Sequence, residues 1–314
     1  MNARQLAALL FLAAAWGASF LFIRVAAPVL GPFPLMAGRV LLAAGALWAI
    51  ARARRTPVAL RPYWKQLLVL GLVHAAAPFA LIAAAEVRLT ASMAAVLIAA
   101  QPLFVVLIGG VCFGEPVSLR RATGLFLGLL GVAVLVGWSP LALDRTVALS
   151  IAATLVAALC YAAGSVYARR RMAEVPVLTL ALGQQLAAAV WLAVPAAIVL
   201  PRAHLTAGAV GAMTALALVC TALAYLTFFW LLGQVGAVKA ATMTYVIPVF
   251  GVVWGTALLH EPLSMGVVAG LGGILLSLVL VNNVRLWPRL TPSAAPTSQR
   301  WYWPPSVRAP SESR

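Results

Sequence analysis

Apolar residues fill this chain in long runs, and polar residues form short clusters between the runs. A helix of about 20 apolar residues crosses ~30 Å of hydrocarbon. Alternating segments of ~10 residues, which are typical of a membrane barrel, do not occur. The pattern therefore predicts an all-α integral membrane protein with ten transmembrane helices. They are expected at residues 6–25, 35–51, 66–85, 91–113, 119–138, 147–168, 177–200, 207–232, 237–259 and 264–283.

One stretch of the chain occurs twice. Residues 94–135 align without a gap on residues 240–281, 146 positions later, and 13 of the 42 aligned positions are identical. The identities include Pro102 with Pro248, and the Glu-Pro pair at residue 115 recurs at residue 261. Upstream, an offset of 145 aligns Trp16 with Tyr161. Self-similarity over this length indicates a duplicated half. The prediction is a first five-helix repeat at 1–140, a second at 146–284 and a disordered cytoplasmic tail at 285–314.

Five crossings per half would insert the second half upside down relative to the first, and the basic residues agree with such an arrangement. With the N-terminus inside, 17 of the 22 Lys and Arg residues fall on the inner side and four on the outer side, while Arg39 lies within a span. Basic residues favour cytoplasmic loops. We expect inverted repeats in the cell inner (cytoplasmic) membrane, with both termini cytoplasmic.

Composition excludes several classes of protein. The chain is 64% hydrophobic and 9% charged, whereas soluble domains average about 25% charged residues. The net charge of +16 comes from clusters between apolar spans, so we predict no nucleic-acid partner. The three cysteines have no His or Cys neighbours at ligand spacing, which favours packing roles and predicts neither metal nor cofactor.

Short motifs add a family resemblance. The motifs are Trp16-Gly17-x-Ser19-Phe20, Pro34 followed by Arg39, and Glu-Pro after the fourth and ninth predicted helices. Over residues 6–283 the chain resembles the EamA-type transporters of the drug/metabolite transporter superfamily. The resemblance implies a ten-helix basket with a central cavity, its fifth and tenth helices at the periphery, and small metabolites as substrates, commonly exported. The second half departs from the pattern, because Tyr161 replaces the Trp and Gln184 or Gln185 replaces the Arg.

Arg39 is the first candidate binding residue, because a charge inside a span is costly. It lies about six residues into its predicted helix, roughly 9 Å deep. The competing interpretations are extension of the side chain to the outer headgroups and a structural pair with Glu86. Structural support is the more common role for such a group.

His74 is the titratable group nearest to a membrane midplane. It could handle a proton, or it could be satisfied by a bond between helices, which is the more common case. The pairs Gln101-Pro102 and Ile247-Pro248 predict helix breaks at matched positions, which in transporters accompany binding sites.

Polar and aromatic residues inside the spans complete the predicted substrate site, although core packing is the common role for any single ring. The candidates are Trp16, Ser19, Arg39, His74, Gln101, Tyr161, Gln185, Tyr225, Thr244 and Tyr245, with Gln184 as the alternative to Gln185 and Trp254 as a further ring. No catalytic residue is predicted.

Two further features favour architecture over chemistry. The motifs Gly124-x-x-x-Gly128 and Gly266-x-x-x-Gly270 permit close helix approach, within the chain or in a homodimer. Glu115 and Glu261 lie beside prolines, where they are expected to support helix ends and loops.

The sequence thus predicts a secondary transporter of amino acids or similar carboxylate-bearing metabolites, working by alternating access and in the direction of efflux. A membrane-embedded enzyme would need a nucleophile, base or metal ligands at shared depth, and none is found. A lipid scramblase is the third hypothesis. The repeat and the matched prolines favour transport over both.

Overall fold

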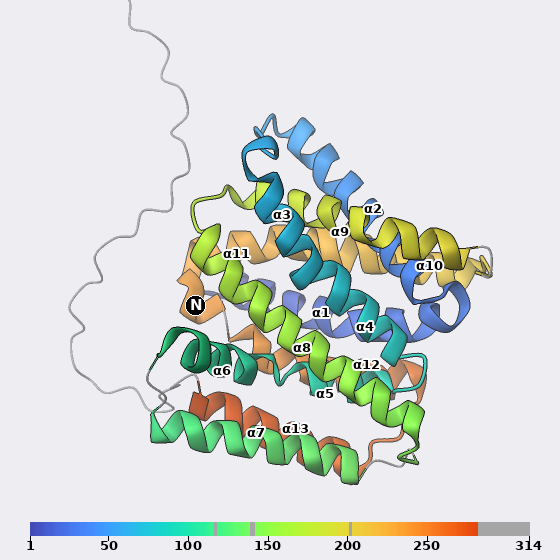
Figure 1. Ribbon diagram of the computed structural model, residues 1–314, viewed down its shortest axis with the longest axis vertical. Coiled ribbons are helices and arrows are strands. Elements are labelled where there is room, and N and C mark those ends of the chain that lie inside the picture. Colours follow the sequence, from blue (N-terminus) through green and yellow to red (C-terminus); the bar gives the residue numbers. More distant parts are fainter. Residues whose placement is uncertain (116–117, 139–141, 201–202, 241, 282–314) are drawn as a thin grey trace, which may run out of the picture. The chain divides into compact units, whose positions relative to one another are not determined.

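The computed structural model describes residues 1–115, 118–138, 142–200, 203–240 and 242–281, and in these ranges it contains helices and connections but no strand. Residues Met1–Val284 form one compact unit. The predicted tail, residues 285–314, lies outside the described residues. The all-helical prediction is confirmed (Figure 1).

The first half of the chain contains these elements: α1 (Ala3–Leu30), α2 (Pro32–Ala53), a 3-10 turn (Arg61–Tyr63), α3 (Trp64–Gly71), a π-helix η2 (Leu72–Ala76), α4 (Ala77–Ala85), α5 (Ala91–Ile98), α6 (Gln101–Phe113) and α7 (Leu119–Gly137). The second half contains α8 (Arg145–Arg171), α9 (Val177–Val199), α10 (Ala207–Ala217), a second π-helix η4 (Leu218–Leu223), α11 (Ala224–Ala240), α12 (Met243–Leu259) and α13 (Met265–Val281).

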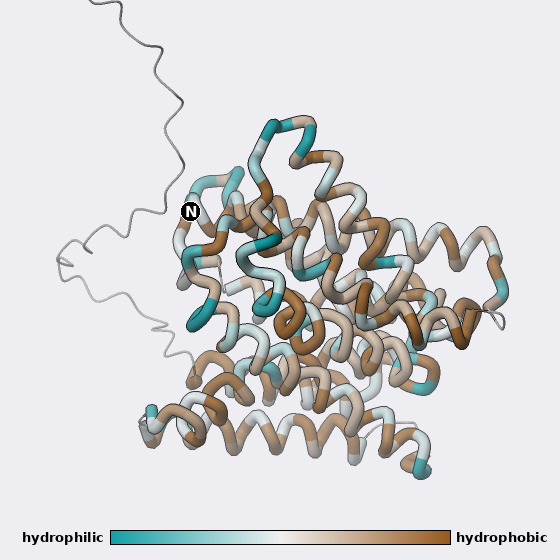
Figure 2. The backbone as a smooth tube through the Cα atoms, turned by 45° about the horizontal axis from the view of Figure 1, so that its top comes forward, coloured by the Kyte–Doolittle hydropathy of each residue, from teal (hydrophilic) through white to brown (hydrophobic). Residues whose placement is uncertain are grey.

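Eight helical segments of the described chain are long and apolar enough to cross a membrane. They are Ala3–Leu30, Pro32–Ala53, Arg61–Ala85, Ala91–Phe113, Leu119–Gly137, Arg145–Arg171, Val177–Val199 and Ala207–Gly236. Two shorter apolar helices, α12 and α13, follow them. Hydrophilic residues gather at the helix ends and connections, while the helices are mostly apolar (Figure 2). The chain is therefore a multi-pass membrane protein.

The first turn is tighter than the sequence predicts. α1 continues through Pro28 to Leu30, and Gly31 alone separates it from α2. Gly31 has a φ of 83°, which a residue with a Cβ rarely adopts. Pro32 occupies the start of α2, where its missing N–H costs nothing. The predicted helices at 6–25 and 35–51 leave Pro28 and Pro32 in a loop, but both residues lie in helices.

The prolines of the repeat do not produce matched breaks. In the first half the helix is interrupted at Ala99 and Ala100, directly before Gln101-Pro102. In the second half Pro248 lies inside α12. The expectation of equal breaks at the two prolines is thus wrong. The second half is instead interrupted upstream, where Gly236 has a φ of 77° within α11.

Helices α7 and α13 pack closely through glycines of their Gly motifs and through Gly131. Gly124 of α7 faces Ser277 and Val281 of α13, and Gly131 faces Gly270 and its neighbours. The residue numbers run in opposite directions, so the two helices are antiparallel and lie side by side (Figure 1). Close backbone approach is the usual effect of such motifs in membranes. The glycines are therefore used for contact within the chain, and the homodimer remains a prediction.

The outer faces of this helix pair are apolar. Phe126 and Leu129 of α7 are 67% and 60% exposed, and Leu276 of α13 is 52% exposed. Large apolar side chains on the outer surface of long apolar helices suit contact with lipid.

Local capping explains where α8 begins. The Asp144 carboxylate accepts hydrogen bonds from the Val147 N–H and the Thr146 hydroxyl, both 2.7 Å long. These donors favour the charged form and lower the pKa of Asp144 below its ordinary value. Four orphan N–H groups begin every helix, and this side chain satisfies one of them.

Candidate functional site

Arg39 lies in the protein interior, about two turns after the start of α2. Its side chain is 6% exposed, and its Nε donates a 3.0 Å hydrogen bond to the Thr221 hydroxyl. The guanidinium carbon lies 3.8 Å from the centroid of the Phe79 ring, a cation–π contact. The side chain therefore does not extend to a membrane surface. The ion pair among the described residues is Arg170 with Glu115, so a direct pair of Arg39 with Glu86, which was one of the competing interpretations, is absent there.

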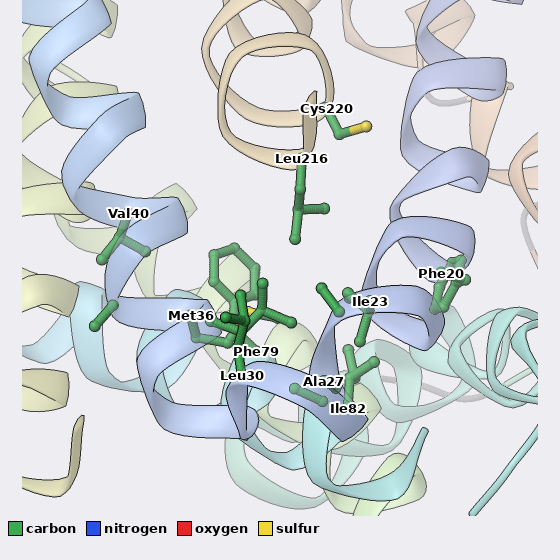
Figure 3. Close-up of a cluster of buried hydrophobic side chains, with 14 of the residues drawn as sticks. Phe20, Ile23, Ala27, Leu30, Met36, Val40, Phe79, Ile82, Leu216 and Cys220 are labelled. Carbon is green, nitrogen blue, oxygen red and sulfur yellow. The ribbon is translucent and has the colours of Figure 1, made fainter. Parts of the chain in front are cut away.

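Arg39 lies beside an extensive apolar cluster, to which Phe79 and Cys220 belong. Leu30, Met36 and Phe79 lie together, and Leu216 and Cys220 lie above them in the view of Figure 3. Because water is scarce among such side chains, electrostatic interactions of the guanidinium are stronger there than at a surface.

Two π-helices carry the polar groups that flank this region. His74 lies on η2 and Thr221 on η4. At the repeat offset of 146, Leu72 corresponds to Leu218, so the two π-helices begin at equivalent positions. Short π-helices are rare and frequently occur at functional sites.

The two halves contact one another's π-helices. Arg39 of α2 binds Thr221 on η4. In return Gln184 of α9, the counterpart of Arg39 at offset 145, lies next to the His74 imidazole on η2. The second helix of each half therefore supports the widened turn of the other half. The positive charge of the first half is matched by an amide in the second.

His74 belongs to a small polar network. Its Nε2 lies 3.3 Å from the Ser165 hydroxyl of α8, and the Gln101 amide donates to the same hydroxyl at 3.3 Å. The Nδ1 atom of His74 is buried and has no hydrogen-bonded partner in the described part of the chain. Ser165 thus joins two predicted residues that lie on separate helices.

Aromatic rings connect the network to Arg39. The Tyr161 ring lies 5.5 Å from His74 and 6.3 Å from Phe79, both edge-on. In the other half, the Gln184 amide donates a 3.1 Å hydrogen bond to the Tyr225 hydroxyl. Trp16 meets the Tyr225 ring at 6.4 Å.

The structure therefore brings most of the predicted residues together. The set that these contacts connect, here called the central cluster, is Trp16, Arg39, His74, Gln101, Tyr161, Gln184 and Tyr225, with Phe79, Ser165 and Thr221.

Other candidates lie outside these contacts. The Tyr245 hydroxyl donates to the Leu278 carbonyl of α13 at 3.2 Å, and neighbouring Thr244 lies on the same helix. The Ser19 hydroxyl bonds back to the Ala15 carbonyl of its own helix. Gln185 is fully buried, and its amide atoms have no hydrogen-bonded partner among the described residues. Gln184 is thus the better counterpart of Arg39.

Three members of the central cluster were not predicted from the sequence: Phe79, Ser165 and Thr221. The repeat offers a route to one of them, because Phe79 corresponds to the predicted Tyr225 at an offset of 146. Thr221 directly follows Cys220, for which the sequence favours a packing role. The π-helix that presents Thr221 has no pattern of its own in the sequence.

The arrangement suits the binding of a small polar solute. A buried guanidinium recognises a carboxylate with charge-assisted hydrogen bonds. Tyrosine, tryptophan and phenylalanine rings supply apolar walls, with polar tips on the first two. In the described residues, no group of three or more His, Cys, Asp or Glu side chains could hold a metal ion.

Comparison with known proteins defines the class of this membrane protein. The EamA-like transporter family matches twice, over residues 4–137 and 148–283. The chain is 30% identical over 301 residues to the uncharacterized inner membrane transporter YedA of Escherichia coli, covering 90% of this chain and 92% of that protein. The chain belongs to the EamA-like transporter family.

Other relatives agree with this membership. A protein of Escherichia coli named a probable amino-acid metabolite efflux pump is 27% identical, covering 86% of this chain and 91% of that one. The uncharacterized transporter YoaV of Bacillus subtilis is 22% identical, with coverages of 81% and 88%. A solved crystal structure shares the fold with a TM-score of 0.62 at 20% identity, covering 89% of this chain and 96% of the other.

Proposed function

We propose that this protein is a secondary transporter that exports small carboxylate-bearing metabolites, such as amino acids, across the cytoplasmic membrane. Membership of a transporter family supports transport. A relative named as a probable amino-acid metabolite efflux pump supports the substrate class and the direction. The observation that carries the proposal is the buried guanidinium of Arg39 among aromatic rings.

The hydrogen bonds of Arg39 use only part of its guanidinium group. Thr221 accepts from Nε, and in the described part of the chain neither terminal nitrogen has a hydrogen-bonded partner. These two nitrogens form the fork that binds a carboxylate in bidentate fashion. The amide of Gln184 and the hydroxyl of Tyr225 lie on the opposite half and add neutral hydrogen-bonding groups. This distribution suits a carboxylate better than a cation.

We further propose ten crossings in two inverted halves, residues 1–140 and 146–284. The antiparallel packing of α7 with α13 supports inversion, because these helices correspond in the repeat. The reciprocal contacts of α2 with η4 and α9 with η2 support it too. With 17 basic residues on one side and four on the other, both termini face the cytoplasm. Alternating access would then proceed by exchange of conformation between the halves.

Substitution of Arg39 tests the proposed site. Arg39→Lys keeps the charge and removes the fork, and Arg39→Gln removes both. A hydrogen bond to a charged group contributes about 1.5–3 kcal/mol, so we expect each variant to lower the transport of carboxylates in proteoliposomes by about 10- to 100-fold.

The control for this experiment is Arg145→Lys, because Arg145 is exposed at the start of α8. Melting temperatures in detergent must be measured for all variants, so that loss of folding is separated from loss of binding. Full transport by both Arg39 variants would remove Arg39 from the site.

A further inference from the structure

The connection between α4 and α5, residues 86–90, is held from both ends; it is called the first connection below. Arg24 of α1 donates to the backbone carbonyls of Glu86 and Val87, at 2.5 and 3.0 Å. Leu89, in the middle, is fully buried.

The start of α5 is held by a carboxylate from the other half of the chain. Glu261 accepts hydrogen bonds from the Ala91 N–H at 2.7 Å, the Ser92 N–H at 3.0 Å and the Ser92 hydroxyl at 2.6 Å. Negative charge at a helix N-terminus is stabilised by the N–H groups and by the helix dipole. Glu261, which lies in the connection after α12, therefore fastens the first connection to the second half.

Glu86 is buried in the first connection, with its side chain 0% exposed, and its carboxyl oxygens accept no hydrogen bond from any described residue. The charged and titratable groups that face it are Arg24 from α1, Arg39 from α2, Tyr161 from α8 and Glu261. Neither arginine forms an ion pair with it, and Glu261 repels a negative charge.

A charged carboxylate in such a place is costly, because burial removes its water and nothing replaces the lost hydrogen bonds. Adding one proton removes the charge and with it most of the cost. An exposed glutamate, by contrast, is ionised at neutral pH.

We propose that Glu86 is a proton-binding site, which takes up one proton when the first connection closes over it and releases that proton when the connection opens. The step is Glu86–COO⁻ plus H⁺ giving Glu86–COOH, with the proton exchanged with the water that reaches the open connection. Closure is therefore favoured as pH falls. This inference rests on the proposed function in one respect, since it treats the connection as a gate of the transporter.

The equivalent place in the second half has no such group. At the offset of 146, residues 86–90 correspond to residues 232–236, called the second connection, and Glu86 corresponds to Leu232. Glu115, the counterpart of Glu261, is instead half-exposed and pairs with Arg170 at 3.2 Å. The proton site thus belongs to one end of the molecule alone, and the pH on that side controls the gate.

A labelling experiment without any substrate tests the proton site. Ala91 is fully buried under the closed connection, so Ala91→Cys, in a variant lacking Cys112, Cys160 and Cys220, reports opening to a membrane-impermeant maleimide. Ala142→Cys, exposed in the connection before α8, corrects for the intrinsic pH dependence of thiol reactivity. The corrected rate should rise up to about tenfold per pH unit between roughly pH 5 and 8, as binding of a single proton requires.

Replacing Glu86 should remove this dependence. Glu86→Gln imitates the protonated form, and Glu86→Leu copies the residue at the corresponding position, so two chemically different variants are available. Both should label slowly at every pH, while Glu174→Gln, which removes an exposed carboxyl elsewhere, should keep the slope. A flat profile in the parent protein, or an unchanged slope in both Glu86 variants, would overturn the proposal. Because no solute is transported in this assay, failure of the proposed substrate class leaves its result intact.

Discussion

The two connections show how one repeated sequence pattern can hold two conformations. In the first connection, Glu86 and Leu89 are buried, and Arg24 and Glu261 hold its two ends. In the second connection, Gly233 and Gly236 are exposed, and a Cβ at either position would meet nothing within 4 Å. Among the described residues, the first connection thus has hydrogen bonds from Arg24 and Glu261, whereas no side chain of another element bonds residues 232–236.

Side chains at corresponding positions explain part of this difference. Thr90 caps α5, because its hydroxyl accepts a 3.1 Å hydrogen bond from the Met93 N–H. Its counterpart at offset 146 is Gly236, which has a φ of 77° and no side chain to form a cap. Gly costs conformational entropy in a helix and leaves the backbone free to move. The second connection is therefore built to change shape more readily than the first.

The comparison also gives the carboxylates of the two Glu-Pro motifs different roles. In both motifs the glutamate N–H bonds a glycine carbonyl six residues earlier, at 3.1 Å. The backbone is thus alike, and only the side-chain partners differ. Glu261 binds a helix start of the first half, and Glu115 binds Arg170. In an alternating-access cycle, the two glutamates would exchange these states.

The side of the membrane on which the first connection lies can be tested in intact cells. If the first connection faces outward, an impermeant thiol reagent should label Ala142→Cys completely and should not label Arg54→Cys in the loop after α2. After permeabilisation both sites should react. Labelling of the two positions from the same side of an intact membrane would disprove the topology.

Weakening the hydrogen bonds that Glu261 makes to the start of α5 should open the first connection. Glu261→Gln removes the charge that three donors share, which costs about 1–2 kcal/mol at a helix N-terminus. The Ala91→Cys labelling rate should then rise about 5- to 30-fold, with little change in melting temperature.

The matched control is Glu115→Gln, which changes the corresponding residue of the other half. Glu115 and Arg170 are both half-exposed, and such ion pairs contribute at most about 1 kcal/mol. Ala91→Cys labelling should therefore remain unchanged in this variant. Equal effects of the two substitutions would mean that the halves are not distinguished by their fastening.

Much of the fold could be predicted from the sequence, because apolar run length directly reports helices that cross a membrane. The helix boundaries agree closely for α5 with α6, for α7 and for α9. Pro28 was misplaced, because a proline signals only a missing N–H and leaves open whether the helix continues beyond it. The π-helices could not be predicted, since the extra residue in a turn is accommodated by packing against the other half.

The candidate site was predicted in part for similar reasons. Arg39 and His74 stand out because polar groups in apolar spans are few. Their partners Thr221 and Ser165 are common residue types, and only the crossing of distant helices brings them close. Tyr245 shows the limit of the approach, because a ring inside a span can equally face a peripheral helix.

Transport by this protein is proposed to depend on a carboxylate bound by Arg39. The most direct test of this dependence is counterflow in proteoliposomes, with a panel of radiolabelled amino acids, each compared with its carboxamide analogue. The predicted result is saturable exchange of at least one acid, which is absent from protein-free liposomes and at least about tenfold slower for the carboxamide, because the charge-assisted fork is lost. Equal exchange of acid and carboxamide, or no exchange of any solute on the panel, would contradict the claim.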